Sequence, residues 1–113
     1  MATGPCAALL DRVGGDEQIF LELCEAFLAD APKRLESIRA AVAAGDARTL
    51  QREAHALKGA AGAFDALDVV AVTRQLEQLA LAGDLADAHH LWKLLEMHGR
   101  ALLDAVRAGT NRP

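Results

Sequence analysis

One histidine, His55, stands in a sequence context suited to nucleophilic chemistry at the protein surface. The apolar residues around it recur at intervals of four, three, four and three positions, at Leu50, Ala54, Leu57, Ala61 and Phe64. At about 100° per residue, this spacing places them on one face of an α-helix. His55 lies roughly 140° from the centre of that face, so we expect its imidazole to face solvent. With an ordinary pKa of about 6.5, such an imidazole keeps one ring nitrogen free to act as a nucleophile at neutral pH.

Two glycines follow the histidine on the same side of the predicted helix. Gly59 comes one turn after His55, and Gly62 comes two turns after it. A glycine inside a helix costs about 1 kcal/mol relative to alanine, so the stability of the helix does not explain the pair. What the glycines provide is room for the backbone of a partner beside the imidazole. Lys58, at the third position after His55, adds a cation on the same flank.

The motif itself resembles a known family. Residues 55–59 read His-Ala-Leu-Lys-Gly, and small residues follow in Ala60-Ala61-Gly62. This segment resembles the core motif of the histidine-containing phosphotransfer (HPt) family, H-x-L-K-G. The similarity extends over residues 10–105 and includes Gly14-Gly15-Asp16, Leu76-Glu77 and Ala82-Gly83-Asp84. One difference lies just after the motif helix, where family members often carry Gly-Ala and this chain has Asp65-Ala66.

The resemblance implies a phosphocarrier of a two-component phosphorelay. His55 would accept a phosphoryl group from a receiver-domain aspartate, or from a kinase, and pass it to another receiver as a labile phosphoramidate. The implied partners are response-regulator receiver domains and a sensor histidine kinase. No nucleotide-binding motif is present, so we expect no enzyme activity of its own and no cofactor; Mg²⁺ would belong to the receiver. The alternative is a helical docking module that binds receivers without using His55.

The resemblance also implies roles for the residues around the histidine. Independently of the resemblance, the charge of a phosphoryl group needs a nearby cation, and Lys58 is the candidate to stabilise it. The alternative is that Lys58 is a plain solvated lysine. In family members a polar residue on the following helix commonly orients the imidazole, and the motif spacing assigns this position to Glu77, which is flanked by Gln75 and Gln78. A carboxylate there would accept the Nδ1 hydrogen and leave Nε2 as the nucleophile. The alternative is that Glu77 is an ordinary solvated helix residue.

A docking face for partners is expected around the motif. It comprises Gly59 and Gly62 together with three polar residues on the preceding turns, Arg48, Gln51 and Arg52.

Composition limits the class of protein. A chain of 113 residues, of which 52% are hydrophobic, suffices for one domain with one core. The net charge of −4 argues against a nucleic-acid partner, which would need a basic face. No apolar run approaches 18 residues, and no basic segment followed by an apolar run opens the chain. We therefore expect a cytoplasmic monomer without direct membrane contact.

Helical patterns run through the whole sequence. The predicted helices cover residues 5–13, 17–44, 47–63, 66–82 and 85–107. Short connections between four long helices imply an all-α, antiparallel up-down four-helix bundle, with a short extra helix at the N-terminus. The domain spans residues 1–113, with the bundle core at about 16–107 and a frayed tail at 108–113.

Helix boundaries are indicated by glycine and aspartate. Gly45-Asp46 and Gly83-Asp84 each place a glycine after one helix and an aspartate before the next. Asp65 is expected to be the N-cap of the 66–82 helix, with Asp68 in the capping-box position. Pro32 removes one backbone hydrogen bond from the 17–44 helix. We expect a kink there, or alternatively two helices divided near residues 30–32.

The other histidines give no metal site. His89 and His90 are adjacent and therefore face different directions, whereas His98 falls near the apolar stripe of its helix. A metal-binding bundle needs ligands three or four positions apart on facing helices. Asp87 with His90 is the one near match, and no second pair faces it. We therefore expect no bound metal.

Overall fold

The chain folds into a bundle of helices. The structure is a computed structural model, and it describes residues 4–110. Within this range there are five helices and no strand. Their bounds are α1 Pro5–Arg12, α2 Glu17–Ala44, α3 Ala47–Gly62, α4 Leu67–Ala82 and α5 Ala88–Thr110. The predicted all-α bundle with a short N-terminal helix is confirmed.

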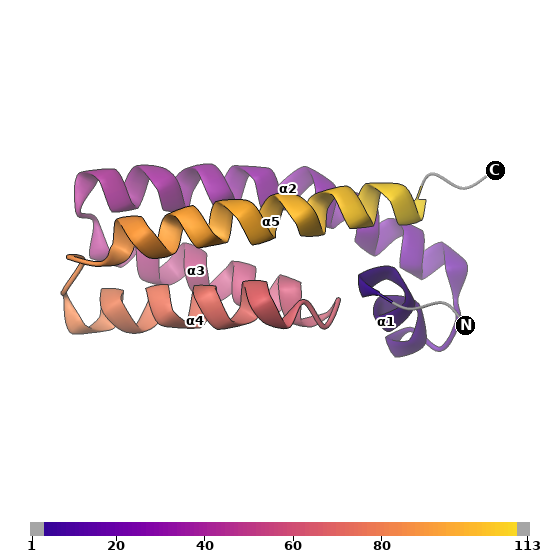
Figure 1. Cartoon of the computed structure of the whole chain (residues 1–113). Helices are drawn as coiled ribbons and strands as arrows, with labels where there is room; N and C mark the ends of the chain where they lie inside the picture. The colour runs from indigo at the N-terminus through magenta and orange to yellow at the C-terminus, as the bar shows by residue number, and fades with distance from the viewer. Residues whose placement is uncertain (1–3, 111–113) are drawn as a thin grey trace.

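The four long helices pack as neighbouring pairs. α3 lies between α2 and α4, and α5 completes the bundle against α4 and α2. The molecule is elongated, 45 × 19 × 18 Å, and α1 covers one end of it by packing on α5 and α2 (Figure 1). No helix within residues 4–110 is both long enough and apolar enough to cross a membrane.

The core follows the predicted apolar stripes. All five members of the stripe on the motif helix are buried: Leu50, Ala54, Leu57, Ala61 and Phe64. The ring of Phe64 lies 4.8 Å, centroid to centroid, from the ring of Phe27 on α2. Trp92 on α5 is also buried. On the opposite side of α3, Arg52, His55 and Gly59 are exposed to solvent.

Aspartate and glycine define several helix ends, and Gly45, Asp46 and Gly83 do so as predicted. The side chains of Asp16 and Asp46 cap α2 and α3 by accepting hydrogen bonds of 3.1 Å from backbone N–H groups. Gly45 and Gly83 end α2 and α4 in the left-handed conformation that favours glycine. α2 runs through Pro32 as a single helix, so the alternative division near residues 30–32 is wrong.

The expected cap of α4 is wrong. Ala66, not Asp65, is the N-cap residue, and its side chain has no hydrogen-bonding group to cap the helix. Asp65 instead adopts a positive φ of 51°, and its carboxylate lies 2.5 Å from the guanidinium of Arg12 on α1. The sequence pattern predicts that the carboxylate of Asp65 caps α4. In the structure this carboxylate instead forms an ion pair with Arg12 of α1. Asp68 does not reach back as a capping box would; it accepts a hydrogen bond from its neighbour Val69.

Both ends of α5 also differ from the prediction. The helix begins at Ala88, because Asp84 forms a local turn in which its side chain accepts a hydrogen bond from Ala86 N–H. It continues to Thr110, so residues 108–110 are helical rather than frayed. Here α1 packs on its last turns: a Cβ added to Gly109 would clash with Cys6 Sγ. The rest of the predicted tail, residues 111–113, lies outside the described range.

Candidate functional site

The face of α3 opposite the core presents His55. Its side chain is 65% exposed, although its neighbours Ala54 and Leu57 are buried. The prediction of a solvent-facing imidazole from helical periodicity is therefore confirmed.

A buried carboxylate on α4 reaches this imidazole. Glu77 is buried between the helices, and its Oε2 lies 2.6 Å from Nδ1 of His55. An ionised carboxylate can only accept hydrogen bonds, so the neutral ring carries its proton on Nδ1 and its lone pair on Nε2. The alternative of a solvated Glu77 is excluded by its burial.

The same carboxylate also binds a cation. Lys58 on α3 donates from Nζ to Oε1 of Glu77 over 2.5 Å. These interactions hold the pKa of Glu77 below its ordinary value: the hydrogen bond from Lys58 contributes most and the one from His55 less, and burial opposes both. Glu77 is therefore a carboxylate at neutral pH. It accepts hydrogen bonds from two side chains of α3, those of His55 and Lys58.

Lys58 forms a contact with Glu77 that its position three residues after His55 did not predict. Its side chain is half-buried, and its ammonium points to Glu77 instead of standing free in water. Stabilisation of phosphoryl charge by Lys58 stays a prediction. What the geometry adds is charge compensation: the ammonium offsets the buried carboxylate that lies next to the imidazole.

The two glycines beside the histidine make no tight contact. A Cβ built on Gly59 or Gly62 would meet nothing within 4 Å. Packing within the protein therefore does not require glycine at either position. Both have ordinary helical backbones inside α3, so a left-handed conformation does not require glycine either.

The polar residues predicted for the docking face lie on the turns before the histidine. Arg48 and Arg52 are exposed, and Gln51 is half-buried. Arg52 approaches the carboxylate of its neighbour Glu53 at 3.7 Å. Within residues 4–110, none of the three polar residues is hydrogen-bonded to His55, Lys58 or Glu77, so the structure does not join them to that network.

An exposed apolar pair lies on α2 and was not predicted from the sequence. Ile19 and Leu23 are 45% and 44% exposed. The signal that could have found them is their spacing: Phe20, Cys24 and Phe27 form the buried stripe, and Ile19 and Leu23 each precede a member of it by one residue, about 100° around the helix.

The remaining histidines do not form a metal site. Within residues 4–110, no group of three or more His, Cys, Asp or Glu side chains is placed to hold a metal ion. His89 and His90 are exposed, and His98 is half-buried with its Nδ1 3.2 Å from a carboxylate oxygen of Asp68.

Comparisons with known proteins identify the class. The sequence model of the Hpt domain matches residues 22–109. The structure is similar to the crystal structure of histidine-containing phosphotransfer protein B (HptB) from Pseudomonas aeruginosa PAO1, with a TM-score of 0.86 and 27% sequence identity, covering 95% of this chain and 93% of that chain. No match was found among curated proteins.

The chain therefore belongs to the Hpt domain family. It is a histidine phosphotransfer domain of the kind that carries phosphoryl groups in two-component phosphorelays. Members of this family interact with receiver domains and kinases and serve as phosphocarriers.

Proposed function

We propose that His55 is the phosphorylated residue, accepting a phosphoryl group from the aspartyl phosphate of a receiver domain, or from a kinase, and passing it to another receiver. The observation that carries this proposal is the contact of 2.6 Å between Nδ1 of His55 and Glu77, on a histidine that is otherwise exposed. The contact sets the tautomer, and the exposure leaves the opposite nitrogen accessible.

The reaction uses the lone pair of Nε2. Nε2 attacks phosphorus, the bond between phosphorus and the aspartyl oxygen breaks, and its electron pair leaves with the carboxylate of the receiver. The proton on Nδ1 stays in place, so the phosphorylated ring becomes a cation. The carboxylate of Glu77 stabilises this charge through a charge-assisted hydrogen bond. The reverse sequence of bonds delivers the group to the next aspartate.

Lys58 offsets the negative charge beside His55, which favours the approach of an anionic phosphoryl group. A phosphoryl group brings negative charge towards Nε2, and an uncompensated carboxylate in the adjacent position would repel it. Because the Lys58 ammonium is bound to Glu77, the pair adds little net charge. The orienting carboxylate can therefore remain ionised without opposing the reaction.

Partners dock on the face around His55. The two glycines leave this surface open, and Arg48, Gln51 and Arg52 extend it along α3. A receiver approaching here would bring its own acidic pocket and Mg²⁺, so this chain needs no nucleotide, cofactor or metal of its own. We also assign the domain to the cytoplasm, as a monomer that meets its receivers and its sensor kinase one at a time.

Transfer from a labelled receiver tests the assignment. The wild-type chain and His55→Gln are incubated with a ³²P-phosphorylated receiver, and acid-labile label on each is measured. We expect the wild type to gain label and the variant to gain none, with unchanged helicity by circular dichroism, because the His55 side chain is 65% exposed and is not part of the apolar core. Label retained by the variant would refute the role of His55. Equal binding of receiver by both chains without any transfer would identify a docking module instead.

A further inference from the structure

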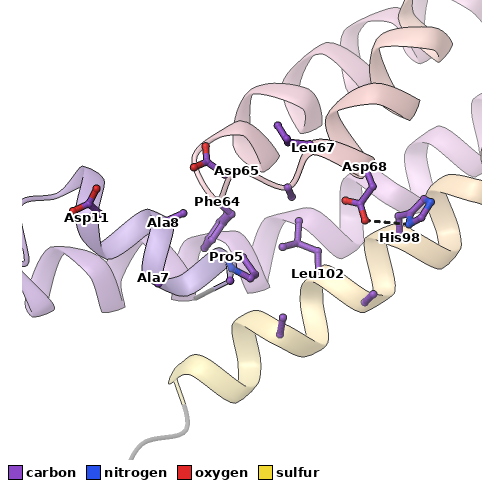
Figure 2. A pocket seen from close by; sticks show the side chains of 14 residues that line it. Pro5, Ala7, Ala8, Asp11, Phe64, Asp65, Leu67, Asp68, His98 and Leu102 are labelled. Atoms are coloured by element: carbon purple, nitrogen blue, oxygen red, sulfur yellow. Dashed lines mark ion pairs between the residues drawn. The ribbon is translucent and has the colours of Figure 1, made fainter. Parts of the chain in front are cut away.

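A groove lies at the end of the bundle covered by α1. It has a volume of about 930 Å³ and runs between α1, the α3–α4 turn and α5. Figure 2 shows α1 along one wall, with Phe64 and Asp65 of the turn facing it and α5 opposite. The groove is open to solvent, so a segment of a partner chain can enter it from outside.

The walls of the groove are apolar and mostly small. They consist of Pro5, Ala7 and Ala8 from α1, Phe64 from the turn, and Ala101, Leu102 and Ala105 from α5. Leu67 stands at the lip with 74% of its surface exposed. Small side chains leave depth for a larger apolar side chain from outside, and Leu67 offers it further apolar surface.

The rim of the groove is acidic, and its carboxylates come from three separate elements. Asp11 lies on α1, Asp65 in the turn and Asp68 at the start of α4. Asp65 is paired with Arg12, and Asp68 is paired with His98. Within residues 4–110, Asp11 has no ion pair. Asp11 therefore leaves at least one uncompensated carboxylate on the rim, and this favours a cationic occupant.

The groove is separate from the face that carries His55. None of the residues lining it belongs to the network of His55, Lys58 and Glu77, and none belongs to the predicted docking face on α3. An occupant of the groove and a receiver at His55 would therefore contact different residues.

We propose that this groove, defined by α1, the α3–α4 turn and α5, binds a basic segment of a partner polypeptide. An apolar side chain of the segment fills the space between Ala8 and Leu102, against Leu67. Lysine or arginine residues flanking it contact Asp11 and Asp68. The site goes beyond the phosphotransfer function and does not depend on it, because its test measures binding alone.

Two substitutions separate the apolar and the charged contributions. The probe is a fluorescein-labelled peptide of two leucines between two pairs of arginines, titrated by fluorescence anisotropy at physiological salt. Leu67→Ser should weaken binding about tenfold by removing apolar contact. Asp11→Lys should weaken it about threefold to fivefold. Both side chains are exposed, so both variants should fold.

Matched controls lie elsewhere on the surface. Leu81→Ser changes a leucine that is 70% exposed at the other end of α4, and Glu25→Lys makes the same change of charge on α2. We expect both controls to bind the probe within about twofold of wild type. Amide chemical shifts in ¹⁵N-labelled protein should change at Ala8, Leu67 and Ala101 on addition of peptide.

Three outcomes would overturn the proposal. Equal weakening by Glu25→Lys and Asp11→Lys would mean that only the net charge of the chain attracts the peptide. Equal binding of a peptide with glutamine in place of arginine would remove the charge argument. Concentration-dependent shifts at the groove without any peptide would identify a second copy of this chain as its occupant.

Discussion

Gly59 on α3 and Gly99 on α5 are both glycines inside long helices, and their surroundings are opposite. A Cβ on Gly59 would meet nothing within 4 Å, whereas a Cβ on Gly99 would lie 3.3 Å from a methyl carbon of Leu35 on α2. The glycine on α5 lets two helices of the bundle approach each other. Among residues 4–110 the glycine on α3 has no such packing role, so we interpret the clearance it provides as room for another molecule. The comparison separates glycines that serve packing from glycines that serve access.

The largest effect is expected from a bulky side chain at the open position. Gly59→Gln should fold, because the site faces water, and should slow transfer from a phosphorylated receiver by roughly 100-fold, since a displacement of about 1 Å in an in-line reaction costs that much. Rates are measured in a rapid-quench assay with labelled receiver. A small-molecule phosphodonor needs less clearance and should be less affected.

Gly59→Ala is the control for this change. It should raise the free energy of unfolding by up to about 1 kcal/mol, through better helix propensity and a less flexible unfolded chain. Transfer by Gly59→Gln at the wild-type rate would show that receivers approach from another side. Unfolding of Gly59→Gln would contradict the open environment of this position.

Substituting valine at each of the two glycines should have opposite effects: loss of stability at Gly99 and loss of transfer rate at Gly59. Gly99→Val forces additional carbons against Leu35, and we expect it to lower the free energy of unfolding by about 1–3 kcal/mol without changing the rate of transfer by the folded protein. Gly59→Val should leave stability unchanged or raised and should slow transfer. Urea denaturation and the transfer assay together check both halves. A stable Gly99→Val would remove the distinction between the two positions.

A smaller effect on transfer is expected from Lys58→Ala. This variant leaves the carboxylate of Glu77 beside the imidazole without its ammonium partner, and we expect transfer to slow by about tenfold. Lys58→Arg keeps the charge and should recover most of the rate. Equal rates for all three proteins would show that the Lys58 ammonium, although bound to Glu77, plays no part in transfer.

The smallest effect is a pH dependence of stability that arises from Glu77. Its pKa is lower in the folded state than the ordinary value of 4.5, so the folded state favours its ionised form. This contribution to stability is fully present above about pH 4.5 and is lost as the pH falls through the folded-state pKa. Wild type should therefore be more stable than Glu77→Gln at pH 7, with a difference that shrinks towards pH 3.

The control for the pH series is Glu25→Gln, an exposed change on α2. Its difference from wild type should stay small throughout. A difference between wild type and Glu77→Gln that is constant from pH 7 to pH 3 would mean that the carboxylate is not stabilised by Lys58 and His55.

Local sequence rules predicted the motif helix well, because its features depend on residues close together in the chain. The exposure of His55 and the burial of Leu57 follow from periodicity alone. The contact of Glu77 with His55 crosses from α4 to α3. Periodicity predicts which face of its own helix a residue occupies. It does not predict how α3 and α4 pack against each other. The pairing was predicted through the family resemblance, whose motif spacing pointed to Glu77.

The errors arose where distant segments decide a local conformation. Asp65 has the side chain of a good N-cap, but Arg12, far earlier in the chain, binds its carboxylate. The end of α5 is likewise covered by α1, which supplies Cys6 beside Gly109. Ile19 and Leu23 are apolar without being buried, and hydrophobicity alone does not separate an apolar residue of the core from an apolar residue on the surface.

The three side chains of the phosphotransfer site all belong to one helical hairpin. His55 and Lys58 lie on α3 and Glu77 lies on α4, the helix that follows it directly. α1, α2 and α5 contribute none of these reacting or orienting groups. Sequence drift in those helices is therefore limited by stability and by partner recognition, not by the chemistry of the imidazole. A lineage could change its choice of partners through these three helices while inheriting the same reactive hairpin.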